Sequence, residues 1–182
     1  MEAFHPANIP RPFTVFVSFF GSIIGCLGVI NLIPRRDTVF DVGHYLYRRI
    51  PNSYEPEYLI AVKALMFLMQ DPCYFCFFQF LWLASLFLWA RMALMWITTL
   101  PYLNHRDHIP FYGLVGGFND FLPFSGHTAA SLLLSLFMAP KTGPIVYLTD
   151  IWLCYLLIAM RRHYTIEIVL SLLFTYWLKI EA

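Results

Sequence analysis

The sequence predicts an all-α integral membrane protein, a single domain over residues 1–182 built as a bundle of about six transmembrane helices. Composition is the first reason: 59% of the residues are hydrophobic, only 13% are charged, and the mean hydropathy is +0.63. Soluble domains usually carry about 25% charged residues. The second reason is that apolar runs of nearly membrane-spanning length recur between polar connections.

The first of these runs, residues 13–33, follows a short polar and proline-rich tail at residues 1–11. It is long enough to cross about 30 Å of hydrocarbon. Gly21, Gly25 and Gly28 lie three or four residues apart within it, which predicts a face for close packing against another helix. The run is preceded by prolines rather than by a basic segment, so we expect no cleavable signal peptide.

The next two runs each contain a cationic residue. Residues 58–69 form a short run with Lys63 inside, which predicts either a lysine that snorkels to the interface or a re-entrant piece. Residues 74–100 form a longer run that contains Arg91. This arginine either snorkels or faces a polar interior.

The last three runs cover residues 128–139, 145–160 and 164–178. Asp150 lies inside the middle one. A carboxylate within a span is costly and is therefore a candidate functional group, unless it pairs with a neighbouring helix or lies shallow enough to reach water.

The charge and cysteine content exclude several functions. A net charge of +1 provides no broad basic surface, which argues against nucleic-acid binding. Cys73 and Cys76 have no second cysteine pair or nearby histidines at metal-ligand spacing, so we interpret them as packing residues. We expect no metal and no cofactor.

Two histidines stand where apolar runs begin. His127 follows Ser125 and Gly126, and His163 precedes the last run. Two predicted crossings separate them, so both should face the same membrane boundary. Glu167 lies four residues after His163, on the same helix face. A carboxylate there sets the tautomer of the imidazole and frees the other ring nitrogen for attack, which indicates acid–base and nucleophilic chemistry on a lipid headgroup.

Three segments resemble the sphingomyelin synthase family and its relatives in the lipid phosphate phosphatase superfamily. They are Ser-Gly-His at residues 125–127, His-Tyr-Thr-Ile-Glu at residues 163–167, and the segment from arginine to Leu-Pro at residues 91–101. The plant phosphatidylcholine:diacylglycerol cholinephosphotransferases are similar too. The order and spacing agree over roughly residues 30–178, and three elements in register are more specific than one.

The resemblance implies a six-span transferase that moves phosphocholine, or a related headgroup, from a membrane phospholipid to ceramide without a metal. His163 would be the nucleophile that forms a phosphohistidine, and Glu167 would orient it. His127 would protonate the departing diacylglycerol oxygen and then deprotonate the acceptor hydroxyl.

The candidate substrate-binding residues come from the same segments and from two polar connections. Ser125, beside the amides at Gly126, would hold phosphoryl oxygens at a helix start. Arg91 belongs to the arginine-containing segment. Asp120 precedes Ser-Gly-His, and Asp41 lies in an acidic segment after the first run.

Two departures from the family pattern leave alternatives open. The family carboxylate is usually aspartate, whereas this chain has Glu167. The hydrolase branch has a Lys-x6-Arg-Pro element and a Ser-Arg-x5-His element, and the absence of both favours transfer. The alternatives are transfer to diacylglycerol, an ethanolamine or inositol donor, a lipid phosphate phosphatase, and a catalytically inactive lipid-binding relative.

The resemblance also predicts a multi-pass protein of the Golgi, endoplasmic reticulum or plasma membrane with a lumenal or extracellular active face. The positive-inside rule favours the opposite orientation, because most arginines fall on that face. They are Arg35, Arg36, Arg48, Arg49, Arg106, Arg161 and Arg162. We follow the family, since arginines beside a phosphate-handling site have a separate purpose.

Overall fold

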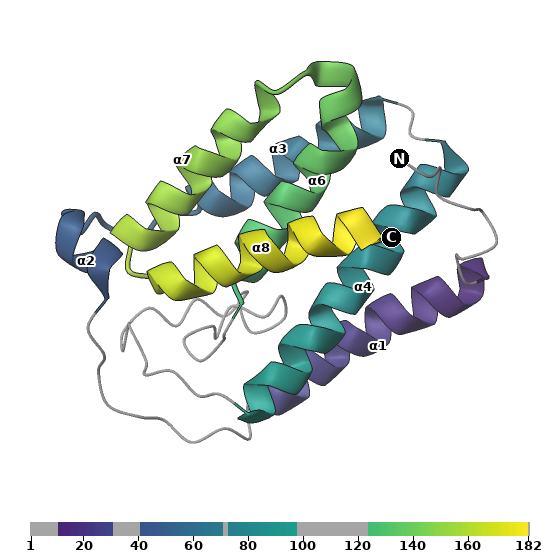
Figure 1. Ribbon diagram of the computed structural model, residues 1–182, viewed down its shortest axis with the longest axis horizontal. Helices are drawn as coiled ribbons and strands as arrows, with labels where there is room; N and C mark the ends of the chain where they lie inside the picture. Colours follow the sequence, from purple (N-terminus) through teal and green to yellow (C-terminus); the bar gives the residue numbers. More distant parts are fainter. Residues whose placement is uncertain (1–10, 31–40, 71–72, 98–123, 182) are drawn as a thin grey trace.

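The computed structural model describes residues 11–30, 41–70, 73–97 and 124–181, and these form a helical bundle (Figure 1). Its seven described helices are α1 (Pro12–Ile30), α2 (Val42–Leu46), α3 (Glu55–Met69), α4 (Tyr74–Ile97), α6 (Gly126–Thr142), α7 (Val146–Ala159) and α8 (Thr165–Glu181). The predicted all-helical character is therefore correct for this part of the chain.

The prediction of about six membrane-spanning helices is wrong. Across the described ranges, a single helical segment is long and apolar enough to cross a membrane: Tyr74–Leu94 in α4, with 21 residues and a mean hydropathy of 1.5. Length is the main reason. At 1.5 Å per residue, the 14 residues of α7 and the 17 of α8 rise only about 21 Å and 26 Å, short of the roughly 30 Å of hydrocarbon. A multi-pass location has no support from these helices.

Helix α1 lies alongside α4 (Figure 1). Gly21 and Gly25 line this contact, and a Cβ atom on Gly25 would come within 2.5 Å of the Met92 Sδ atom. On the same interface, the Trp89 indole N–H donates to the Ser18 hydroxyl at 3.0 Å. The close packing predicted for Gly21 and Gly25 is confirmed.

Helix α6 is the centre of the bundle and packs against α3, α4, α7 and α8. It begins where Ser125 caps its first turn, with the Ser125 Oγ atom accepting from the Thr128 N–H. It ends at Gly143, whose φ of 74° is a backbone conformation that glycine adopts readily and other residues rarely do. Its buried apolar face contacts two hydrophobic clusters, one of Phe67, Leu134, Met138 and Val146 and one of Phe87, Phe124, Ala129 and Leu178.

Lys63 does not snorkel, since it is only 3% exposed within α3. Its ammonium group donates to the Ser131 and Ser135 hydroxyls at 2.8 and 2.7 Å and pairs with Asp150 Oδ1 at 2.5 Å. Asp150 therefore pairs with a neighbouring helix, one of the two alternatives for it. A buried charge is tolerated only when it is paired in this way, so the cluster fixes how α3 and α7 pack on α6.

Candidate functional site

The turn between α7 and α8 carries His163. Arg161 ends α7 in the left-handed region, at φ 59°. The next two amides, of Arg162 and His163, both donate to the Leu157 carbonyl, at 2.9 and 3.3 Å. The chain thus folds back under the end of α7, which leaves His163 only 1% exposed.

Helix α2 holds this turn in place. Asp41 accepts from the backbone N–H and the hydroxyl of Thr165, the first residue of α8, at 2.7 and 2.8 Å. It also caps α2 by accepting from the His44 N–H at 2.9 Å. The His44 Nε2 atom lies 2.9 Å from the His163 carbonyl. Only 6% of the Asp41 side chain is exposed, and its contacts position the turn. Its expected role in substrate binding stays a prediction.

His163 and Glu167 form a buried pair. The His163 Nδ1 atom lies 2.7 Å from Glu167 Oε2, and the same oxygen accepts from the Tyr164 N–H at 3.2 Å. Both side chains are 1% exposed. With Nδ1 donating to the carboxylate, the lone pair of the histidine is on Nε2, which is the tautomer required for nucleophilic attack.

Burial and nearby arginines keep this imidazole neutral. Burial, and after it the positive charges of Arg91 and Arg162, together lower the pKa of His163 to about 3. Burial raises the pKa of Glu167 well above its usual value, although the Tyr164 N–H and the charge of Arg91 oppose this. At neutral pH His163 therefore carries the lone pair that a nucleophile needs.

His127 brings the second imidazole to the same place from the first turn of α6. Its ring centroid lies 5.9 Å from that of His163, with 61° between the ring planes. Its Nε2 atom lies 3.2 Å from the Glu57 Oε1 atom. Burial lowers the pKa of His127, and the hydrogen bond to Glu57 opposes that shift. Each histidine therefore has its own carboxylate.

Glu57 is a site residue that sequence reasoning missed. It lies in the first turn of α3 and also accepts from the Arg162 guanidinium at 2.8 Å. An acidic residue in the first turn of a helix is ordinary, which conceals the functional pattern. The available signal was that Glu57 precedes an apolar run, as His127 and His163 do.

Arg91 and Ser125 complete the described site. Arg91 is buried and faces the polar interior, since a Cβ atom on Gly126 would lie 2.5 Å from its Nη1 atom. Ser125 is buried, its hydroxyl caps α6, and its N–H donates to the Ser171 hydroxyl of α8 at 2.5 Å. The expected role of Asp120 lies outside the described residues. No cluster of three His, Cys, Asp or Glu side chains arranged to hold a metal occurs within the described ranges.

Three helices begin at this site. The first turns of α3, α6 and α8 supply Glu57, His127 and Glu167 respectively. A helix start carries a partial positive charge and unpaired N–H groups. Together with the guanidinium groups of Arg91 and Arg162, this arrangement favours an anion such as a phosphodiester.

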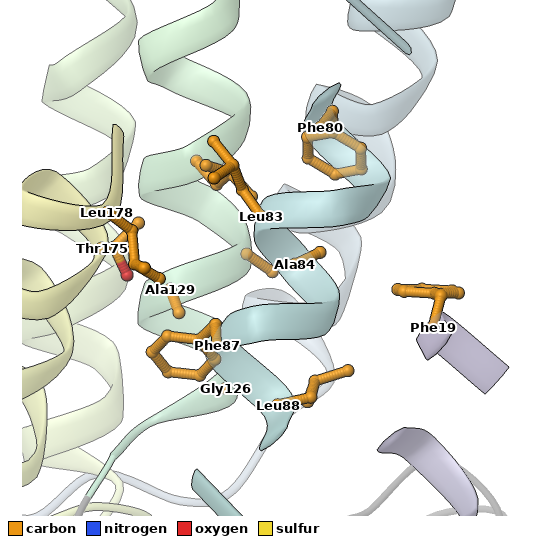
Figure 2. Close-up of a pocket in the computed structure, with 12 residues that line it drawn as sticks. Phe19, Phe80, Leu83, Ala84, Phe87, Leu88, Gly126, Ala129, Thr175 and Leu178 are labelled. Atoms are coloured by element: carbon orange, nitrogen blue, oxygen red, sulfur yellow. The ribbon is translucent and has the colours of Figure 1, made fainter. Parts of the chain in front are cut away.

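An apolar cavity of about 200 Å³ reaches the site at Gly126 (Figure 2). It lies between α1, α4, α6 and α8. Thr175 contributes a buried hydroxyl that has no hydrogen-bond partner among the described residues. The other lining residues are apolar: Phe19, Phe80, Leu83, Ala84, Phe87, Leu88, Ala129, Ala130, Leu133 and Leu178. A hydrocarbon chain suits such a lining better than a polar ligand does.

Comparison with known proteins adds no family assignment. No family model matches this sequence, and no curated protein matches it. The functional argument therefore rests on the site. Two imidazole rings lie 5.9 Å apart, the buried one is neutral, and each is paired with a different carboxylate. The helix starts and arginines around them favour an anion.

Proposed function

We propose that this protein is a membrane-bound transferase that moves phosphocholine, or a related phospho-headgroup, from a phospholipid to the hydroxyl of ceramide through a phosphohistidine. One observation carries the proposal: two imidazoles lie 5.9 Å apart and each is hydrogen-bonded to a different carboxylate. A two-step transfer needs one nucleophile and one group that acts first as an acid and then as a base.

In the first step, His163 Nε2 attacks the phosphorus of the donor. The new bond is P–N, and the bond that breaks joins phosphorus to the diacylglycerol oxygen. Protonated His127 gives its proton to that oxygen, so diacylglycerol leaves as a neutral alcohol. Glu167 stabilises the positive charge that develops on the His163 ring, because its carboxylate holds the Nδ1–H.

In the second step, His127 takes the proton of the acceptor hydroxyl as that oxygen attacks the phosphorus. The P–N bond breaks, its electron pair returns to His163 Nε2, and His127 is left protonated for the next cycle. Glu57 supports both protonation states of His127, since its carboxylate orients the ring and stabilises the imidazolium.

A membrane lipid as substrate is supported by three features of the described part. The cavity beside Gly126 is apolar, and the Tyr74–Leu94 segment can cross a membrane. The outer faces of α1 and α8 expose large apolar side chains, a surface that prefers lipid to water. They include Phe13, Val17, Phe20, Ile24, Leu173, Tyr176, Trp177 and Ile180. We propose a Golgi, endoplasmic reticulum or plasma membrane location.

The test uses two donors to distinguish the roles of the two histidines. Purified protein in detergent is given phosphatidylcholine labelled in its headgroup, or a nitrophenyl ester of phosphocholine whose leaving group needs no proton. Ceramide, diacylglycerol and water are offered as competing acceptors. We expect wild type to transfer label to ceramide.

The variants assign the roles. His163→Ala should form no protein adduct with either donor. His127→Ala should form the acid-labile adduct from the nitrophenyl donor but should fail to pass it to ceramide. Label on the His163→Ala protein, or transfer without any adduct in wild type, would overturn the mechanism. Preferred release to diacylglycerol or to water would replace ceramide as the acceptor.

A further inference from the structure

Cys73 and Cys76 form a thiol pair at the start of α4. Cys73 immediately precedes the helix and is exposed, and Cys76 is half-buried in its first turn. The Cys76 N–H donates to the Cys73 Sγ atom at 3.2 Å, and the two thiols are hydrogen-bonded to each other. The expectation that both cysteines serve packing is therefore wrong for Cys73.

The spacing of the pair fits a disulfide. Residues three apart on an α-helix have Cα atoms about 5 Å apart, from the rise and radius of the helix. Disulfide-linked cysteines have Cα separations of about 4.4–6.8 Å. An intramolecular bond between Cys73 and Cys76 therefore needs little backbone movement.

The surroundings of Cys73 favour its thiolate. The hydrogen bonds from the Cys76 thiol and N–H lower the pKa of Cys73, and the nearby positive charge of Lys141, from the end of α6, acts in the same direction. Cys154 is the contrast within the same chain, because burial raises its pKa to about 11. Reactivity towards disulfides follows the thiolate form and exposure, so Cys73 is the favoured attacking thiol.

The pair is separate from the histidine site. Cys73 and Arg91 lie at opposite ends of α4, about 27 Å apart at 1.5 Å per residue. The thiols therefore do not belong to the proposed transfer chemistry, and a test of one leaves the other independent.

We propose that Cys73 and Cys76 are a reversible dithiol site that reacts with low-molecular-weight disulfides such as oxidised glutathione. The Cys73 thiolate attacks one sulfur of that disulfide, forms a mixed disulfide and releases one thiolate. The Cys76 thiolate then attacks Cys73 Sγ, forms the Cys73–Cys76 bond and releases the second. The two protons lost by the protein thiols end on the two small thiols, so the small disulfide is reduced as the pair is oxidised.

The experiment uses the full chain in detergent, first reduced and then incubated with oxidised glutathione. Intact mass and peptide mapping follow the products. Wild type should lose the mass of two hydrogen atoms and yield one peptide linking Cys73 to Cys76, reversed by reduced glutathione. Cys76→Ser should stop at a stable glutathione adduct on Cys73. Cys73→Ser should form neither product at this site, and Cys154→Ser should behave like wild type.

A rate measurement checks the same idea without a mutation. Iodoacetamide at neutral pH should alkylate Cys73 at least about tenfold faster than Cys154, because the thiolate fraction differs by more than that. A stable adduct on Cys73 in wild type with no internal bond would overturn the proposal. So would bonds to Cys154, or a failure of oxidised glutathione to react at all.

Discussion

The length of the Glu167 side chain offers the most discriminating test of the site. The structure places the Glu167 Oε2 atom 2.7 Å from His163 Nδ1. Shortening the side chain by one methylene, about 1.5 Å per C–C bond, moves that oxygen to roughly 4 Å. Hydrogen bonds of this type end near about 3.2 Å, so Glu167→Asp should lose the contact.

The expected cost follows from the bond that is lost. A hydrogen bond to a charged group contributes about 1.5–3 kcal/mol, and about 1.4 kcal/mol corresponds to a tenfold change in rate. Glu167→Asp should therefore reduce kcat by about 10-fold to 150-fold. Glu167→Gln keeps the length and an accepting oxygen but removes the charge that stabilises the imidazolium. A comparable change in a serine protease triad lowers kcat by about 10⁴, so Glu167→Gln should have a lower kcat than Glu167→Asp.

The assay compares initial rates of labelled phosphocholine transfer to ceramide in detergent, with equal amounts of folded protein confirmed by thermal unfolding. Glu55→Gln is the matched control. The exposed Glu55 carboxylate lies in the same helix turn as Glu57 but accepts a hydrogen bond from the Trp152 indole N–H at 2.8 Å. This substitution should leave the transfer rate unchanged. Equal rates for wild type and Glu167→Gln would remove Glu167 from the mechanism. Activity that appears only in Glu167→Asp would instead identify an inactivated relative.

Three further predictions concern the second carboxylate, the cavity and the buried lysine. Glu57→Gln removes the hydrogen bond that raises the His127 pKa, so the alkaline limb of kcat/KM against pH, where His127 loses its proton, should move to lower pH; an unshifted limb would refute this. Ala130→Leu fills the cavity and should raise KM for a long-chain donor about 10-fold to 50-fold, from about 0.8 kcal/mol per displaced methylene, while KM for a short-chain donor stays constant. Lys63→Ala leaves Asp150 buried without its ammonium partner and should lower the free energy of unfolding by about 3–5 kcal/mol in denaturant titrations, whereas replacing both residues by apolar ones should restore most of it.

The sequence predicted the local geometry of the site because that geometry depends on short spacings. His163 lies in the turn just ahead of α8 and Glu167 in the first turn of that helix, so the four-residue interval is short enough for the two side chains to meet. Ser125 ahead of an apolar run predicts a helix start, and α6 begins there. Both relations join residues that are close in sequence.

Long-range pairing was less accessible to sequence reasoning. Glu57 reaches His127 from another helix, and Lys63 reaches Asp150 in the same way. The residues beside Glu57 and Lys63 indicate only a helix start and an interfacial lysine. Their partners become evident only once α3 is known to pack on α6 and α7.

The error in the membrane prediction has a related cause, and it does not extend to the site. Apolar runs in a sequence indicate buried segments, but the same apolar residues occur in helices buried against other helices and in helices buried in lipid. Helix length distinguishes these two kinds of burial. The caps that end α7 and begin α6 make these helices shorter than the hydrocarbon thickness of a bilayer. The same caps bring His127 and His163 together, because each histidine lies at the turn where a shortened helix begins or ends. The feature that removes the six-span bundle is therefore the one that builds the two-histidine site.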